Sequence, residues 1–363
     1  MNAPTATCRM YMRDKMVLTF FQNLFEVVND SSFYLLLGFL IAGLIHEFIS
    51  SKRLAYHLGG SSLKSILKAS LIGTPLPLCS CGVIPTAIGL RKDGASQEAT
   101  VSFLISTPET GVDSISISYA LLDPLMTIVR PIAAIITSIS AGIIEKIFGR
   151  KNDLRTNPVK EDSCKCEENE SRVNISGKNF WQRLKDSFNY GFLDFFGDIV
   201  IYIIIGYILA ALISTLVPEE FILENLAGKG IFPMLGMLVL GIPLYICSTS
   251  ATPIAAALLL KGVSPGAALV LLLSGPATNI TTILAVGKFL GKRSLLLYIL
   301  SIMLVSLSLG LALNWLYDFL RLAPQARIGE GAELIPYGIK LISTFFFIIL
   351  VLFLAWKKII RAL

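Results

Sequence analysis

The 363-residue chain is too apolar and too sparsely charged for a water-soluble protein, since 54% of its residues are hydrophobic, 15% are charged and its mean hydropathy is +0.71. Soluble domains carry about a quarter charged residues. The net charge of +6 does not indicate nucleic acid, because Lys and Arg lie at the ends of apolar segments, as membrane flanks do. The composition predicts a polytopic integral membrane protein, a transporter rather than an enzyme.

The N-terminal segment, residues 1–30, has basic residues ahead of a short apolar run at 16–21. Polar residues interrupt this run and no small-residue cleavage site follows it, so a cleaved signal peptide is not expected. We predict an interfacial amphipathic helix instead.

An internal repeat organises the rest of the chain. When the sequence is shifted by 168 residues, 73–112 aligns with 241–280 without gaps and 15 of the 40 positions are identical. Shared apolar composition does not explain Pro, Gly, Cys and Ser in register. The same shift pairs the apolar segments 33–49, 66–90, 97–122 and 124–148 with 201–217, 234–258, 265–290 and 292–316.

The repeat divides the chain into units. We predict a first transmembrane repeat at 31–149, a polar linker at 150–190, a second transmembrane repeat at 191–320, and an extra C-terminal transmembrane helix within 321–363. The linker is rich in Lys and Arg and too hydrophilic to enter lipid. Each long apolar run is a spanning candidate, because a bilayer core needs about 20 apolar residues per helical crossing.

The distribution of Lys and Arg predicts the topology. The linker and the C-terminus are expected in the cytoplasm and the acidic segment 218–228 outside, in a cell inner membrane. This holds if each half crosses the membrane three times and the Pro-rich segment between the first two crossings returns to its own side. The predicted fold is all-α, with two inverted repeats containing broken or re-entrant helices. A full crossing at 66–90 would give parallel repeats instead, and it misplaces the basic loops.

Each half contains two helix breaks at matched positions. The first is GTPLPLCSCG at 73–82, matched at 241–250, and the second is STPETG at 106–111, matched at 274–279. Proline and glycine leave backbone groups without helical partners, which is tolerable in a membrane only inside protein or beside a wet cavity. The breaks predict a transport site at the repeat interface. The alternative is that they are proline kinks that only shape the packing.

Three cysteines lie at the first pair of breaks. Cys79 and Cys81 are two apart, and Cys247 is the repeat mate of Cys79. Two or three convergent thiolates prefer soft ions such as Cu(I), Zn(II) or trivalent arsenic. The chain has no full C-x-x-C pair or His-rich cluster, which argues against a closed structural zinc site. The alternative role of these thiols is small apolar packing.

Two carboxylates stand in an otherwise apolar segment. Glu109 and Asp113 are four residues apart, and such groups are candidates for proton coupling or cation attraction unless the segment tip is wet. Thr110, Thr278 and Asn279 are possible oxygen ligands, although helix capping is the simpler role.

The linker carries a second C-x-C pair, Cys164 and Cys166, among acidic residues. These thiols could collect a soft ion and pass it to the pore, or the linker could be incidental.

The motif TPLPLCSCGV at 74–83, its echo around Cys247 and GPATN at 275–279 resemble the predicted-permease family that includes trivalent organoarsenical efflux permeases. The resemblance covers residues 30–320. It implies an inner-membrane permease that exports a thiophilic metal or metalloid, with Cys79, Cys81 and Cys247 as candidate ligands. Members with a Cys-bearing hydrophilic linker resemble a branch proposed to export copper or zinc.

The alternative is that the chain is a membrane thiol-redox protein that passes electrons through cysteine pairs. This alternative requires pairs that cycle between dithiol and disulfide, and Cys247 has no partner nearby in the sequence. The sequence contains no nucleotide-binding P-loop, and we expect no resident cofactor. The expected partners are the transported ion and the bilayer, without nucleic acid.

Overall fold

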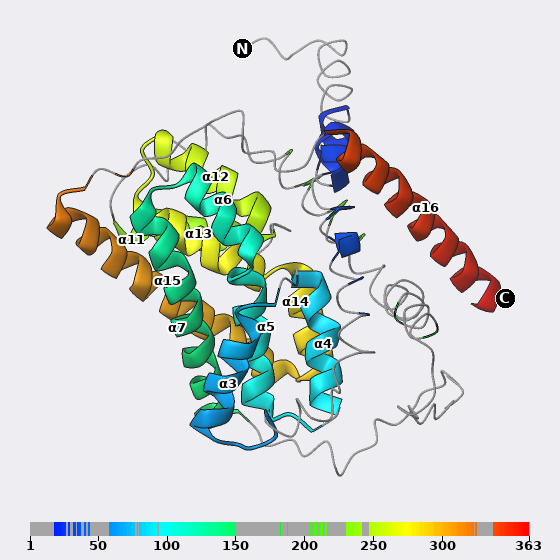
Figure 1. Ribbon diagram of the computed structural model, residues 1–363, viewed down its shortest axis with the longest axis horizontal. Helices are drawn as coiled ribbons and strands as arrows, with labels where there is room; N and C mark the ends of the chain where they lie inside the picture. Colours follow the sequence, from blue (N-terminus) through cyan, green and yellow to red (C-terminus); the bar gives the residue numbers. More distant parts are fainter. Residues whose placement is uncertain are drawn as a thin grey trace, which may run out of the picture.

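The computed structural model is helical, with no strand in the residues that it describes. These residues are 18–26, 58–76, 80–92, 94–149, 230–241, 247–322 and 337–362, with isolated positions between 28 and 43, between 182 and 215, and at 78 and 324. Figure 1 shows long helices running obliquely through the molecule, with shorter helices grouped around them.

Two sets of five helices repeat with one spacing. The first residue of each helix in the second set lies 168 positions after that of its counterpart. The repeat found in the sequence is therefore present in the helix boundaries. The first set is α3 (Leu63–Gly73), α4 (Ser80–Lys92), α5 (Gln97–Glu109), α6 (Val112–Leu121) and α7 (Pro124–Phe148); the second is α11 (Ile231–Gly241), α12 (Ser248–Leu260), α13 (Pro265–Ala277), α14 (Ile280–Phe289) and α15 (Lys292–Leu320).

Equivalent residues start the third helix of each set. Gly94 and Gly262 have φ of +108° and +92°, a conformation that glycine adopts without steric cost. Two residues later, Ser96 and Ser264 cap α5 and α13, and each hydroxyl accepts a hydrogen bond from the backbone N–H three residues on, at 3.3 Å. The sequence identity at these positions thus specifies the same turn twice.

The first helix break lies in a hairpin beside α5. The carbonyl oxygen of Leu58 accepts from Ser96 N, and that of Leu90 accepts from Ala95 N, both at 2.9 Å, so the two ends of the hairpin lie at the start of α5. Gly73, the last residue of α3, lies against the other end of α5. The segment therefore turns back at its break, as the sequence predicts, and α11 and α12 pack on α13 in the second half.

The two long helices, α7 and α15, run antiparallel. Near one end of the pair, Ser294 donates to the carboxylate of Glu145 at 2.7 Å. Near the other end, Tyr317 donates to the carboxylate of Asp123 at 2.7 Å. The start of each helix thus contacts the end of the other, although the two helices occupy equivalent positions in the repeat.

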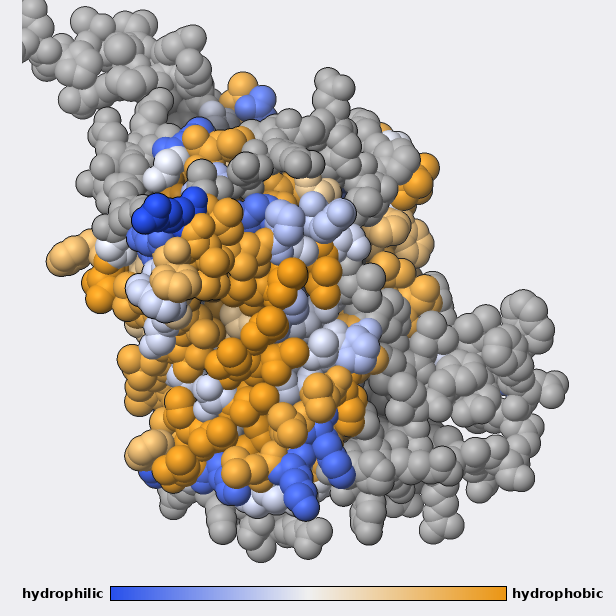
Figure 2. Space-filling view, turned by 60° about the vertical axis from the view of Figure 1, so that its left-hand side comes forward, coloured by the Kyte–Doolittle hydropathy of each residue, from blue (hydrophilic) through white to orange (hydrophobic). Residues whose placement is uncertain are grey.

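Both long helices are apolar enough to cross a membrane. Within the described residues, Pro124–Phe148 and Lys292–Leu320 meet the length and hydropathy of a span, and α13 with α14 forms a third candidate bent by 54°. Figure 2 shows hydrophobic side chains over the middle of one face and hydrophilic side chains toward its upper and lower edges. This distribution fits a protein surrounded by lipid at mid-height.

Glycines bring helix backbones together at equivalent crossings in the two halves. Gly142 of α7 and Gly310 of α15 are repeat mates. A Cβ at Gly142 would lie 3.1 Å from the carbonyl oxygen of Glu98, and one at Gly310 would lie 2.8 Å from that of Gly266. Small residues at such crossings are typical of membrane helices, because they permit close backbone approach.

The C-terminal helix, α16 (Tyr337–Ala362), packs against the N-terminal segment and the second half. Thr344 donates to the side-chain oxygen of Asn29 at 3.0 Å, and Phe347 lies edge-on to Tyr207 with ring centroids 6.2 Å apart. Its apolar stretch, Gly338–Leu354, is shorter than the two spans above. The extra C-terminal span remains a prediction.

Candidate functional site

The half-helices that follow the breaks pack across the boundary between the repeats. Helix α6 of the first half packs on α12 of the second, while α14 of the second half packs on α4 of the first. Helices α5 and α13, each ending at a break, contact one another (Figure 1). These helices, which follow or precede the breaks in the sequence, therefore lie between the halves.

Arg130, in the second turn of α7, joins the two halves at this place. Its side chain is 1% exposed, and its guanidinium donates to Ser118 of α6 at 2.5 Å and to Thr252 of α12 at 2.7 Å. It also donates to the backbone carbonyl oxygens of Ser114 at 3.3 Å and Ser248 at 3.0 Å. A buried guanidinium with acceptors from both repeats fixes the relative position of α6 and α12.

Glu109 ends α5 close to Arg130. The carboxylate is buried, and neither oxygen has a hydrogen-bond partner among the described residues. It interacts electrostatically with Arg130 and with Tyr298, the repeat mate of Arg130 on α15. Tyr298 donates to the carbonyl oxygen of Ala277, the last residue of α13, at 2.6 Å. The ends of α5 and α13 thus meet equivalent positions of the two long helices, but with different chemistry.

The predicted thiol site is only partly described. Cys247 is half-buried and occupies the N-cap position of α12. Cys81 lies in the first turn of α4, and its side chain, like all of Cys79, is outside the described residues. Within the described side chains, no three His, Cys, Asp or Glu residues are grouped so as to hold a metal. Convergence of the three thiols stays a prediction.

The predicted oxygen ligands lie at the second pair of breaks. Asn279 caps α14, since its side-chain oxygen accepts from Thr282 N at 2.8 Å. Thr110 and Thr278 end α5 and α13, and both hydroxyls donate to the carbonyl oxygen four residues before, at 2.7 Å. Capping by Asn279 is confirmed, whereas ligand roles are untested. The remaining predicted residues lie outside the description: the side chain of Asp113 in α6, and Cys164 and Cys166 of the linker.

A second polar cluster lies near the C-terminal end of α7. Gln97 donates to the carboxylate of Glu145 at 2.9 Å, and Ser294 donates to the same oxygen at 2.7 Å. This contact ties the start of α5 and the start of α15 to the end of α7. The sequence reasoning assigned no role to these residues.

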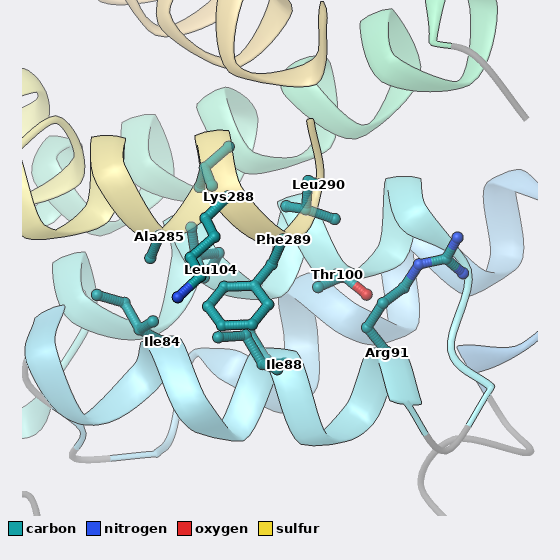
Figure 3. Close-up of a pocket in the computed structure, with 11 residues that line it drawn as sticks. Ile84, Ile88, Arg91, Thr100, Leu104, Ala285, Lys288, Phe289 and Leu290 are labelled. Atoms are coloured by element: carbon teal, nitrogen blue, oxygen red, sulfur yellow. The ribbon is translucent and has the colours of Figure 1, made fainter. Parts of the chain in front are cut away.

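A cavity of about 260 Å³ lies between α4, α5 and α14. Its walls are mostly apolar, and Figure 3 shows Lys288 and the ring of Phe289 projecting from α14 toward α4. The ammonium of Lys288 lies 5.7 Å from the centroid of that ring. Arg91 lies at the end of α4 and donates to the carbonyl oxygen of Ala95 at 2.7 Å.

Comparison with known proteins agrees with a membrane carrier. Residues 11–315 match the family model ArsP_1, described as a predicted permease. The chain belongs to this permease family. No solved structure matches the permease.

Curated relatives are similar over most of their length. A UPF0718 protein of Methanocaldococcus jannaschii is 26% identical over 78% of this chain and 94% of its own. A putative two-component membrane permease complex subunit of Streptococcus mutans is 23% identical over 76% and 91%. The UPF0718 protein YraQ of Escherichia coli is 21% identical over 71% and 70%. The predicted-permease resemblance is thus confirmed at the level of the family.

Sequence reasoning missed Arg130, although a signal was present. An arginine inside the apolar run 124–148 is costly in a membrane and is a functional candidate by default. Its repeat mate is a tyrosine, so a search for matched features passes over it.

Proposed function

We propose that this permease exports a thiophilic metal or metalloid ion, such as copper, zinc or a trivalent arsenic species, by alternating access between two inverted repeats. The observation that carries the proposal is the cysteine at the start of a broken half-helix. Cys247 occupies the N-cap position of α12, and in the sequence Cys79 precedes α4 at the equivalent position. Cysteine sulfur is the kind of ligand that soft ions prefer.

The antiparallel long helices support the inverted arrangement. Helices α7 and α15 hold equivalent places in the repeat, and both are candidate spans. The contacts of Glu145 with Ser294 and of Asp123 with Tyr317 make them antiparallel, so equivalent spans would cross the membrane in opposite directions. Opposite crossing by equivalent helices defines an inverted repeat.

Orientation and coupling complete the proposal. The basic linker 150–190 and the C-terminus face the cytoplasm by the positive-inside rule, and Cys164 and Cys166 in this linker collect the ion. Glu109 and Asp113 couple transport to a proton or attract the cation. For Glu109, support comes from its burial and from the absence of a hydrogen-bond partner in the described part of the chain.

Transport by serine variants tests the proposal. Uptake of Cu(I), Zn(II) or arsenite into inverted membrane vesicles is measured per molecule of permease. We expect Cys79→Ser with Cys81→Ser to abolish uptake, because a hydroxyl is a far poorer ligand for a soft ion, and Cys247→Ser to reduce it about tenfold. Serine is itself a good N-cap, so the loss at Cys247 cannot arise from a lost helix cap.

The matched control is Cys8→Ser, in the N-terminal segment, which leaves uptake unchanged. Replacing Cys164 and Cys166 lowers the rate at scarce ion only, because a collecting linker supplies the pore without forming it. Full uptake of all three probes by the double variant at Cys79 and Cys81 refutes the thiolate site.

A further inference from the structure

The two repeat-related interfaces between half-helices differ in packing. At the interface of α4 with α14, a cavity of about 260 Å³ lies among mostly buried apolar side chains, and Phe289, one of the residues that line it, is 44% exposed. Its mate at the interface of α6 with α12 is Leu121, which is 4% exposed. There the equivalents of several cavity residues belong to one buried apolar cluster: Ile117, Leu121, Leu122, Ala255, Ala256, Leu259, Ala268 and Leu272.

The same sequence positions form the cavity on one side and a latch on the other. Ile84 and Val286 line the cavity. Their repeat mates are Thr252 and Ser118, which accept hydrogen bonds from Arg130 at 2.7 Å and 2.5 Å. Ser114 of α6 and Ser248 of α12 are also hydrogen-bonded to each other. The interface of α4 with α14 therefore holds an apolar cavity, whereas its mate is held together by polar contacts.

We infer that the cavity between α4, α5 and α14 is the intake site for the cargo, and that Arg130 latches the equivalent exit between α6 and α12. This inference rests on the proposed inverted-repeat permease, in which the two interfaces take turns in opening. The structure is then the inward-facing state. Its intake site leads toward the ends of α5 and α13, where Glu109 lies.

The charge distribution places the cavity on the cytoplasmic side. Its mouth lies beside the cluster at the end of α7, since Gln97 donates both to Glu145 and to the carbonyl oxygen of Leu290, a cavity residue. Basic residues gather at this end of the helices, and the positive-inside rule assigns such an end to the cytoplasm. They are Arg91, Lys92, Lys146, Lys288, Lys292 and Arg293.

Paired cysteine variants test the two interfaces against each other. Ala87 lines the cavity and Ala255 is its repeat mate in the closed interface, with 1% and 0% exposure. Each is replaced by Cys in the full chain, and vesicles of either orientation are treated with a membrane-impermeant methanethiosulfonate. Peptide mass spectrometry reads the modified position, so the native cysteines can remain and no transport is required.

We expect Ala87→Cys to react from the cytoplasmic face about tenfold faster than Ala255→Cys from either face, because opening a packed interface costs free energy. Equal reaction of the two positions, or reaction of Ala87→Cys from the outer face alone, overturns the inference. A failed Cys79→Ser transport test leaves this result unaffected, so errors in cargo and in gating are distinguishable.

The latch has its own test. Ser118→Ala combined with Thr252→Val removes two acceptors of Arg130 and preserves side-chain volume. Labelling of Ala255→Cys from outside rises about tenfold when these hydrogen bonds are lost, and labelling of Ala87→Cys from inside falls. Arg130→Gln is the second variant. The control is Ser138→Ala, which removes a 2.6 Å hydrogen bond to Ser70 within one half and leaves both rates unchanged. Unchanged labelling in both latch variants refutes the latch.

Discussion

The two halves of the permease share a backbone but not their charges. Turns, caps and helix crossings recur at Gly94 and Gly262, at Ser96 and Ser264, and at Gly142 and Gly310. The buried charged groups do not recur. Four buried charged residues of the first half have apolar, small or aromatic residues at the equivalent positions of the second half: Glu98 with Gly266, Glu109 with Ala277, Arg130 with Tyr298, and Glu145 with Leu313.

The difference separates what builds the fold from what serves the site. A glycine at a crossing is required wherever two backbones touch, so it is retained in both halves. A buried charge is costly in a membrane, and the buried charges among the described residues occur in one half only. The repeated glycines and serines at turns and crossings therefore identify scaffold residues, and asymmetric charges identify candidates for function.

The largest expected difference between the two halves is in the effect on stability of replacing Arg130 or its repeat mate. We expect Arg130→Leu to lower the free energy of unfolding by about 3–5 kcal/mol, because four buried acceptors lose their donor and the buried Glu109 loses a nearby positive charge. Tyr298→Phe, at the repeat mate, lowers it by about 1 kcal/mol through one lost hydrogen bond. Denaturant titration in mixed micelles measures both. Adding Glu109→Gln to Arg130→Leu recovers part of the loss, and an unchanged double variant contradicts the pairing.

The glycine crossings give the next largest effect. At Gly266, an added Cβ would lie 2.1 Å from the carbonyl oxygen of Gly310, a backbone atom held by two packed helices. At Gly142 the nearest atom, at 2.7 Å, is the γ-methyl group of Ile66, and the nearest backbone atom, the carbonyl oxygen of Glu98, is 3.1 Å away. We expect Gly266→Ala to cost about 3 kcal/mol and Gly142→Ala about 1 kcal/mol. Equal costs in thermal unfolding of the purified protein contradict the different crossing geometries.

The helix caps at the second breaks give the smallest effect. Asn279→Ala removes the cap of α14 and lowers stability by about 1 kcal/mol. Its mate, Gly111, caps α6 without a side-chain hydrogen bond. Gly111→Asn should therefore raise stability by a few tenths of a kcal/mol. Melting temperatures of the two single variants, measured side by side, check both signs.

Local residue chemistry made the scaffold predictable. Proline, glycine and serine at fixed spacing determine where a helix begins and ends, so the four breaks, the hairpin at 66–90 and the cap at Asn279 all follow from sequence. Family membership also follows from the motif at the first break.

The site was less predictable, because its contacts join residues far apart in the chain. Arg130 meets Thr252, 122 positions away, and Gln97 meets Ser294, 197 positions away. No regular spacing in the sequence predicts either contact. The difference between the two half-helix interfaces is equally hidden, since it depends on whether Ile84 or Thr252 occupies equivalent positions of a tertiary interface.

Under the intake proposal, Lys288 at the cavity acts as a charge filter. A bare cation about 4 Å from this ammonium meets a repulsion of about 4 kcal/mol at an effective dielectric constant of about 20. A soft ion whose charge is already masked by its ligands, as in a neutral hydroxide or a thiolate complex, meets no such barrier. Under the intake proposal, the rate of export therefore follows the cellular supply of the ligand that carries the ion, and not the concentration of the free ion.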